Sequence, residues 1–244
     1  MDTSTYAIEA EVEASHWWFV GRRRLLKDLI TRQRIPVDAR VLDIGTSTGT
    51  NLRLLKELGF SNRQGLDRSD EAIRWCAEKG FGRVEKGDAC ELPFGDGEFQ
   101  LVLATDVIEH VDDDLRAITE IRRVLAPGGT AIISVPAFQS LWGLQDDVSH
   151  HKRRYLKKPL LELIRRGRLA CGDIFYFNYL LFLPIWAARQ LIRLLNIKLE
   201  SENQVNTRVL NRILTGIFLL DVATARIVRP PFGVSVIAIA TRNR

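Results

Sequence analysis

Residues 41–50 read VLDIGTSTGT, an apolar run with one aspartate, followed by two glycines four positions apart. This order is typical of a buried strand that passes through a tight loop into a helix. The stretch from Gly45 to Gly49 also has the G-x-S-x-G spacing of a hydrolase nucleophile elbow, and glycine loops of this kind bind nucleotides as well. The rest of the sequence decides which chemistry the loop serves.

The residues around this loop alternate between short apolar runs and helical patterns. Strands are predicted over 41–44, 64–66, 82–86, 99–105, 130–135, 172–177 and 235–241, and helices over 51–58, 70–79, 112–125 and 156–168. A further basic amphipathic helix is predicted within 16–34, before Pro36. Strands that alternate with helices indicate an α/β fold with a mostly parallel sheet that is covered on both faces.

Two interpretations of the loop fit this order of elements poorly. A nucleophile elbow follows earlier strands and an oxyanion loop, whereas only 40 residues precede the first predicted strand here. A dinucleotide loop needs G-x-G-x-x-G, but Ser47 and Leu52 stand at its second and third glycine positions. The sequence therefore favours a third kind of ligand.

Carboxylates recur at the ends of the predicted strands, at Asp43, Asp67, Asp88 and Asp106. In a parallel sheet these ends share one edge, so the four side chains are expected to line one crevice. The acid after the second strand suits ribose hydroxyls, and the one after the third suits an adenine amino group. The glycine loop carries no Lys or Arg for a pyrophosphate. These features favour a nucleoside with a cationic tail, which S-adenosylmethionine (SAM) provides.

Four motifs, VLDIGTSTGTNLRLL, GLDRSDEAI, GDACELPFGDGEFQLVLATDVIEHVDD and RRVLAPGGTAIISVP, follow in this order between about residues 40 and 136. Together they resemble the class I SAM-dependent methyltransferases. The flanks HWWFVGRRR, PAFQSLWGLQDDVSHHKRRY and PFGVSVIAIA resemble a subset of that family associated with polysaccharide and lipid-linked glycan pathways. The resemblance implies a three-layer Rossmann-like fold. Its seven-stranded sheet would be mostly parallel with an antiparallel last strand, and a helical insertion would lie near the C-terminus.

The resemblance also implies a cofactor site for SAM, which leaves as S-adenosylhomocysteine. Its residues would be Asp43, Gly45, Ser47, Gly49, Asp67, Arg68, Asp88, Ala89, Thr105 and Asp106. Ser47 departs from the family pattern, which has glycine there. If this position needs a positive φ angle, serine costs roughly 1 kcal/mol.

Polar side chains near the ends of the fourth and fifth parallel strands are candidates for catalysis and for substrate binding. The predicted catalytic residues are His110, His150 and His151, since an imidazole titrates near neutrality and suits a general base. The predicted substrate-binding residues are Trp17, Arg23, Asp146, Arg153, Arg154 and Tyr155. The alternative is a salt-bridged loop that clamps the insertion. A metal bound by Asp146, His150 and His151 needs suitable geometry, and no metal is included in the predicted site.

We expect one methyltransferase domain over 1–244, with an N-terminal helical lid (1–36), a core (37–177 and 233–244) and a helical insertion (178–232). Residues 151–244 hold 17 Lys and Arg against 5 Asp and Glu, whereas 1–150 hold 18 against 25. The uncharged run over 174–188 is short for a membrane span, which needs about 20 residues. The insertion is therefore predicted to contact anionic lipid or a lipid-bearing substrate, or to form a dimer interface.

The expected activity is in-line transfer of a methyl group to a hydroxyl, less favourably to nitrogen or carbon, of a sugar, lipid-linked or small-molecule acceptor. The alternative is a catalytically silent SAM-binding protein or membrane-associated scaffold. No nucleic-acid motif accompanies the basic charge, so no nucleic-acid partner is expected. Three scattered cysteines and the absence of a secretory signal favour a cytoplasmic protein. Its basic C-terminal part favours a peripheral position on the inner face of a membrane. We expect a monomer or a homodimer.

Overall fold

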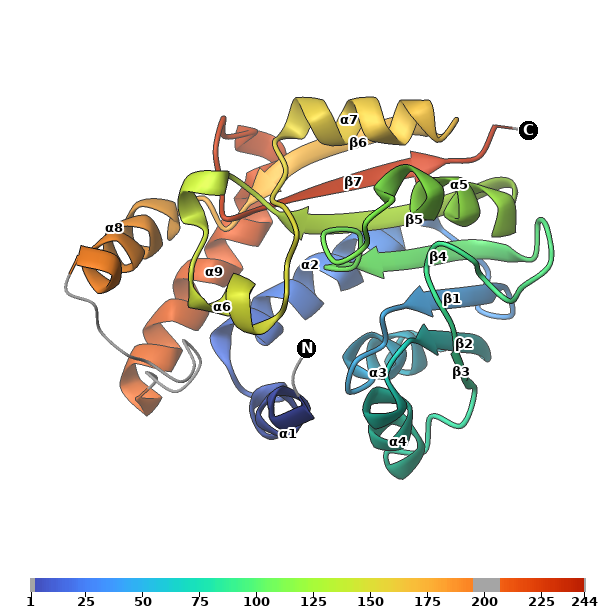
Figure 1. The fold of residues 1–244 in the computed structure, drawn as a ribbon, viewed down its shortest axis with the longest axis horizontal. Helices are drawn as coiled ribbons and strands as arrows, with labels where there is room; N and C mark the ends of the chain where they lie inside the picture. Colours follow the sequence, from blue (N-terminus) through green and yellow to red (C-terminus); the bar gives the residue numbers. More distant parts are fainter. Residues whose placement is uncertain (1–2, 195–206, 244) are drawn as a thin grey trace.

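The computed structural model describes residues 3–194 and 207–243, which fold around one seven-stranded sheet (Figure 1). The strand order is β3-β2-β1-β4-β5-β7-β6. Only β7 runs antiparallel, to both of its neighbours β5 and β6. The predicted mostly parallel sheet with an antiparallel last strand is therefore confirmed. The strands are β1 Arg40–Ile44, β2 Asn62–Asp67, β3 Val84–Lys86, β4 Phe99–Thr105, β5 Leu125–Pro136, β6 Ala170–Phe177 and β7 Ser235–Thr241.

Helices cover both faces of this sheet, which gives the three layers. Their bounds are α1 Thr3–Val12, α2 Trp17–Gln33, α3 Thr50–Glu57, α4 Asp70–Glu78, α5 Asp114–Val124, α6 Leu144–Val148, α7 Lys157–Arg166, α8 Phe182–Leu194 and α9 Arg208–Val228, with a 3-10 turn η1 at Gln139–Leu141. One face packs against α5 and α7, through side chains such as Ile118 and Ile164. The other packs against α2, α3 and α9, through Leu26, Leu55 and Phe218.

The N-terminal segment divides into two parts with different roles. In α2 the side chains of Leu25, Leu26, Leu29 and Ile30 are at most 3% exposed and belong to the core under the sheet. Only α1 lies over the glycine loop that follows β1, so the predicted lid over 1–36 is too long. The sequence predicted no helix over α1, because TSTYAIEAEV shows no clear apolar face.

Part of the predicted insertion also belongs to the core. Phe218, Val222 and Ala225 of α9 are buried against α2 and the sheet. Gly21 makes this contact possible, because a Cβ atom there would overlap the ring of Phe218. Trp18 stacks on the same ring, with centroids 5.4 Å apart. The predicted insertion 178–232 therefore contributes part of α9 to a structural layer of the domain, and α8 stands outside it (Figure 1).

Across residues 3–194 and 207–243, none of the helices combines the length and the apolar character that crossing a bilayer requires.

Replacing Phe218 by alanine tests whether α9 belongs to the core. The ring is fully buried, so Phe218→Ala should lower the free energy of unfolding by about 3–5 kcal/mol. The matched control on the same helix is Leu220→Ala, whose side chain is 59% exposed and whose effect should stay within about 0.5 kcal/mol. Urea denaturation measures both, and equal effects would show that α9 is not a core helix.

Candidate functional site

A cavity of about 660 Å³ opens at the carboxyl ends of β1 and β4. Its walls come from the glycine loop 45–47, the loop after β4, the start of α2, the segment 145–154, and helices α8 and α9. This is the sheet edge at which parallel α/β proteins bind their ligands. Buried polar side-chain atoms without a hydrogen-bond partner, within the described part of the chain, gather here on Arg22, Asn51, Glu109 and Asn178. Their concentration marks the cavity as a ligand site.

The turn from β1 into α3 depends on backbone conformations that few residues adopt. Gly45 and Gly49 have φ angles of 72° and 87°, and a Cβ atom at either would lie within 2.8 Å of a neighbouring side chain. Ser47 has a φ angle of 47°, so serine does occupy the strained region at this position. Its hydroxyl donates a hydrogen bond to the carboxylate of Glu9 on α1, at 3.0 Å. The serine thus ties the N-terminal helix to the loop.

Asp67 and Asp88 lie at the same edge of the sheet, as predicted. In the register between the parallel strands β2 and β3, Asp67 lies opposite Lys86, and Asp88 follows Lys86 by two residues. The Asp67 carboxylate accepts hydrogen bonds from the backbone N–H groups of Ser47 and Ser69, each at 3.0 Å. Burial raises the pKa of Asp67, against these hydrogen bonds. Six predicted cofactor residues lie outside the cavity wall, namely Asp43, Gly49, Asp67, Arg68, Asp88 and Ala89.

Helix α1 covers this part of the edge. Tyr6 is 6% exposed beside Ser69 and Asp67, and burial raises the pKa of its hydroxyl. Glu13, after α1, is 1% exposed and pairs with Arg53 and Lys79, at 3.0 and 2.9 Å. These contacts hold the N-terminal segment against this edge of the sheet. No local pattern predicts them, because Glu13 is distant from both partners along the chain.

A polar network under the glycine loop joins β1, β4, α2 and α3. Asp43 is fully buried and accepts from the amide of Asn51 at 2.9 Å, and this amide also donates to Thr105 at 2.9 Å. Arg22 donates to Thr105 at 2.6 Å and pairs with Asp106 at 3.2 Å. Burial raises the pKa of Asp43 to about 7, although the hydrogen bond from Asn51 acts against this. Thr105 and Asp106 line the cavity, and Asp43 supports them from below.

The arginine that faces the cavity on α2 is Arg22 and not the predicted Arg23. Arg23 donates to the backbone carbonyls of Glu13 and Ala14 instead. Neighbouring residues on a helix point about 100° apart, so one of the two must turn away from the cavity. Trp17 lines the cavity as predicted, together with Trp18.

Two of the three predicted catalytic histidines lie in the cavity wall. His110 and His151 meet edge to face, with ring centroids 4.6 Å apart. Burial, and then the neighbouring His151, lower the pKa of His110 to about 4. His150 is exposed, has a φ angle of 55° and does not line the cavity, so its prediction as a catalytic residue is not supported by its position.

Asp146 is a positioning residue and not part of the cavity wall, contrary to its predicted contact with substrate. It is fully buried and accepts from His151 Nδ1 at 2.8 Å. Arg154 binds both of its oxygens, at 2.8 Å each. Burial alone would raise the pKa of Asp146, but the hydrogen bonds from His151 and Arg154 hold it well below its usual range. The carboxylate therefore fixes two side chains that do line the cavity.

Arg153 and Tyr155 are likewise turned away from the cavity. Both contact Asp114 in the first turn of α5, Arg153 at 3.1 Å and the Tyr155 hydroxyl at 2.8 Å. They clamp the segment after α6 to α5, and not to the insertion as the salt-bridged-loop alternative expected. Of the three consecutive residues 153–155 only Arg154 lines the cavity. The direction in which each side chain of this non-helical segment points depends on tertiary contacts, which the sequence does not reveal.

Several residues of the wall are absent from the predicted catalytic, cofactor-binding and substrate-binding residues. Glu9, His16, Glu109 and Asn178 all line the cavity, and the last two are fully buried. Glu109 directly precedes the predicted His110, so its position after the fourth strand is the sequence feature that indicates it as a site residue. Asn178 has a φ angle of 56° directly after β6, a conformation that asparagine tolerates better than most residues.

Residues 42–133 match the family described as methyltransferase domain. Norajmaline N-methyltransferase of Rauvolfia serpentina is 36% identical over 127 residues, which cover 48% of this chain and 43% of that protein. Demethylmenaquinone methyltransferase of Staphylococcus aureus is 31% identical over 137 residues, covering 51% and 55%. The chain spans about half the length of these relatives.

The fold extends the likeness beyond the matched residues. A methyltransferase solved in complex with the Haloferax volcanii Trm112 methyltransferase activator superposes with a TM-score of 0.65. The match covers 99% of this chain and 97% of that one at 18% identity, a level that shows a common fold. Residues 42–133 thus resemble a methyltransferase domain, and the chain shares the fold of a solved methyltransferase.

At the end away from the glycine loop, the cavity is apolar. Its wall there comes from Trp17, Trp18, Ile185, Ile192 and Leu214. Large apolar side chains continue from this end onto the surface of α8 and α9. The exposed ones on the two helices are Leu183, Trp186, Leu191, Leu194, Val209, Leu210, Ile213, Leu219, Leu220, Ile227 and Val228. We call this set the α8–α9 apolar surface.

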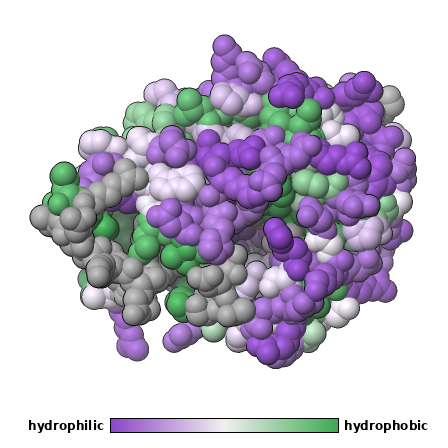
Figure 2. All heavy atoms as spheres, viewed as in Figure 1, coloured by the Kyte–Doolittle hydropathy of each residue, from purple (hydrophilic) through white to green (hydrophobic). Residues whose placement is uncertain are grey.

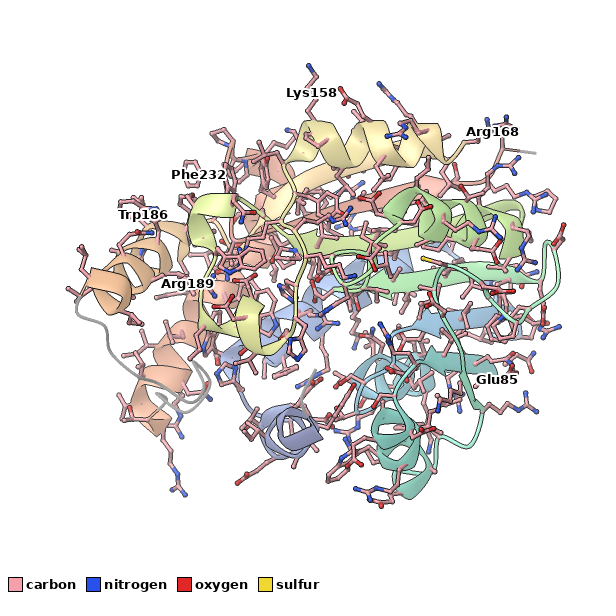
Figure 3. The ribbon with its side chains drawn as sticks, in the orientation of Figure 1. Glu85, Lys158, Arg168, Trp186, Arg189 and Phe232 are labelled. Carbon is pink, nitrogen blue, oxygen red and sulfur yellow. The ribbon has the colours of Figure 1, made fainter. Side chains whose placement is uncertain are left out.

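The figures show the same change of polarity. Hydrophobic residues gather toward the side of the molecule that carries α8 and α9, whereas much of the opposite side is hydrophilic (Figure 2). Trp186 and Phe232 lie at the outer side of this region, and Arg189 points inward (Figure 3). Arg189 donates to the carbonyl of Leu141 in η1, so α8 is attached to the segment that follows β5.

The raised pKa of Asp43 makes the stability of the fold depend on pH. In the unfolded chain this carboxyl ionises near pH 4, but in the fold it stays protonated up to about pH 7. Ionisation therefore favours the unfolded state increasingly as pH rises from about 4 to 7. Relative to Asp43→Asn, the free energy of unfolding of the wild type should fall across this range, by an amount on the order of a few kcal/mol. Urea denaturation at several pH values checks this, and a constant difference would contradict it.

Proposed function

We propose that this protein transfers the methyl group of SAM to a hydroxyl of an amphipathic acceptor, either a sugar, a lipid-linked molecule or a small hydroxylated compound. The observation that carries the proposal is the continuity of one cavity from the glycine loop at Gly45–Ser47 to the apolar wall formed with α8 and α9. Such a cavity has a polar end for the cofactor and its reactive methyl group, and an apolar end for a hydrophobic part of the acceptor.

The cofactor is proposed to lie along the strand ends. Gly45, Ser47 and Gly49 would let the backbone approach its methionine part, with Thr105 and Asp106 on the other side. Asp67 would bind the ribose hydroxyls through the carboxylate lone pairs that its two backbone hydrogen bonds leave available. Arg68, Asp88 and Ala89 would surround the adenine. Asp43 supports this arrangement from below through Asn51.

Methyl transfer requires the acceptor oxygen, the methyl carbon and the sulfonium sulfur to lie in line. The protein contributes mainly by holding this geometry and by excluding water. His110 and His151 are proposed to be the side chains that the acceptor oxygen meets, because they stand in the wall beside the loop after β4. Asp146 fixes the orientation of His151, and with it the place of the acceptor.

The α8–α9 apolar surface supports a lipid-bearing acceptor or contact with a membrane. Arg208 and Arg212 are exposed on α9, next to apolar residues such as Ile213, which is 55% exposed. An amphipathic helix with exposed cations binds the headgroup region of anionic bilayers. We therefore propose a cytoplasmic protein that acts at the inner face of a membrane as a monomer or homodimer.

Asp67→Ala tests cofactor binding. Loss of the carboxylate should weaken SAM binding at least about 10-fold, because charge-assisted hydrogen bonds to the ribose disappear. The control is Asp70→Ala, whose side chain pairs with Lys86 on the exposed surface. Calorimetry with SAM measures both affinities, and circular dichroism confirms that each variant folds. Unchanged affinity in Asp67→Ala would remove the ribose assignment. Turnover of labelled SAM on lipid-linked and free sugars then separates an enzyme from a silent SAM-binding protein.

Vesicle sedimentation tests the membrane contact. The wild type should sediment with vesicles that contain phosphatidylglycerol and stay in solution with pure phosphatidylcholine. The double variant Leu183→Glu/Trp186→Glu, which places two acids in the α8–α9 apolar surface, should lose this binding. Leu156→Glu is the control, because Leu156 is 45% exposed but lies before α7. The proposed contact would be contradicted if sedimentation with vesicles did not depend on lipid charge, or if the double variant sedimented like the wild type.

A further inference from the structure

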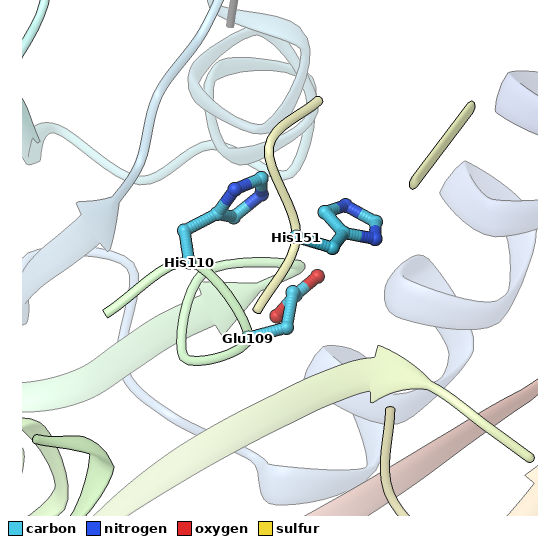
Figure 4. Close-up of side chains that lie close together, drawn as sticks. All are labelled: Glu109, His110 and His151. Atoms are coloured by element: carbon cyan, nitrogen blue, oxygen red, sulfur yellow. The ribbon is translucent and has the colours of Figure 1, made fainter. Parts of the chain in front are cut away.

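Glu109, His110 and His151 bring three metal-ligating groups together in the cavity wall. One ligand atom from each lies within 4.8 Å of the other two (Figure 4). Glu109 and His110 follow β4, whereas His151 follows α6. The two segments are joined by a hydrogen bond from the Lys152 N–H to the Glu109 carbonyl, at 2.9 Å. The cluster is therefore built from two fixed segments and not from one mobile loop.

The Glu109 carboxylate is an unusual group in this position. Its side chain is fully buried, and within the described residues neither oxygen has a hydrogen-bond partner. Leaving a buried carboxyl unpaired is costly. The guanidinium groups of Arg22 and Arg154 pair with other carboxylates, Asp106 and Asp146. The Glu109 side chain thus faces the cavity as an acceptor that lacks a cation.

His151 is oriented as a metal ligand would be. Its Nδ1 atom contacts the buried carboxylate of Asp146 at 2.8 Å, which leaves Nε2 as the atom available in the cluster. A carboxylate behind an imidazole is the usual support of a metal-bound histidine, since it fixes the tautomer and the ring orientation. Because Arg154 holds the same carboxylate through both oxygens, the support is itself rigid.

We propose that Glu109, His110 and His151 bind a divalent transition-metal cation of the Zn²⁺ class. Two imidazoles and one carboxylate suit such a cation, whereas Mg²⁺ and Ca²⁺ prefer oxygen ligands. In a tetrahedral site the ligand atoms lie roughly 3.3 Å apart, so the side chains must close from their present spacing of up to 4.8 Å. This cluster differs from the metal candidate in the sequence, which is Asp146, His150 and His151. Only His151 belongs to both.

Three protein ligands leave a coordination position open toward the cavity. On the proposed function, on which this role rests, the open position would hold the acceptor oxygen close to the glycine loop and the methyl donor. The cation would compensate the charge of Glu109 and orient the acceptor. His110 and His151 would then act as ligands and not as proton acceptors.

Cobalt binding tests the site without reference to activity. The full chain is freed of metal with a chelator and titrated with Co²⁺, whose visible absorption reports coordination by nitrogen. The wild type should bind one equivalent with absorption bands of a low-symmetry site, and Zn²⁺ should displace it. Weak binding without visible bands, or binding of several equivalents to the surface, would overturn the proposal.

Variants identify the ligands. Glu109→Gln and His110→Ala should each weaken Co²⁺ binding by roughly 100-fold or more, since even supporting residues of metal sites contribute 10–100-fold. His150→Ala is the matched control, because His150 is exposed beside His151 but outside the cluster. Circular dichroism confirms the fold of each variant, and two ligand variants are included so that one misfolded protein leaves the other to decide. Binding that survives both, or that is lost equally in His150→Ala, would overturn the assignment.

The same samples separate this inference from the proposed function. SAM affinity is measured by calorimetry on the metal-free chain, where the residues proposed for the cofactor are unaffected. SAM binding without Co²⁺ binding would refute the metal site and leave the methyltransferase proposal standing. Co²⁺ binding without SAM binding would refute the methyltransferase proposal and leave the metal site standing.

Discussion

The sharp turn between β1 and α3 is the constraint on which the site depends. Three of its residues, Gly45, Ser47 and Gly49, adopt positive φ angles within five positions. This conformation turns backbone groups toward the cavity and directs the Ser47 N–H to Asp67 and its hydroxyl to Glu9. The turn therefore couples the second strand and the N-terminal helix to the place where a cofactor would lie. A side chain at either glycine would collide with a neighbour, so this geometry tolerates little change.

The second organising feature is the change in polarity along the cavity. Around the loop after β4, buried polar groups are tightly interlinked, from Asp43 and Asn51 to Arg22 and Asp106. Toward α8 and α9 the wall is aromatic and aliphatic and continues into exposed apolar side chains. A polar reaction site beside an apolar channel favours an acceptor that has both characters. The same polar region holds Glu109, whose two carboxyl oxygens have no hydrogen-bond partner within residues 3–194 and 207–243.

Predictions from the sequence succeeded where local pattern decides structure. The alternation of strands and helices and the glycine loop lie where the pattern placed them. The acids Asp67 and Asp88 also share the predicted edge of the sheet, because parallel strands end together, but of the four acids only Asp106 lines the cavity. The predictions failed for side-chain direction in irregular segments. Among 150–155, His151 and Arg154 reach the cavity, but His150, Arg153 and Tyr155 do not. Contacts with Asp146 and Asp114, remote or non-periodic in the sequence, select these directions.

The sequence by itself determined the fold class, the position of the cofactor loop and the basic, apolar character of the C-terminal part, since each follows from periodicity or composition. Tertiary structure alone decided that α2 and half of α9 belong to the core, because Gly21 admits the Phe218 ring. It also decided that Glu109, His110 and His151 meet, because the Lys152 N–H bonds the Glu109 carbonyl and the buried Asp146 carboxylate orients His151. Such meetings depend on packing between distant segments, for which a linear pattern carries no signal.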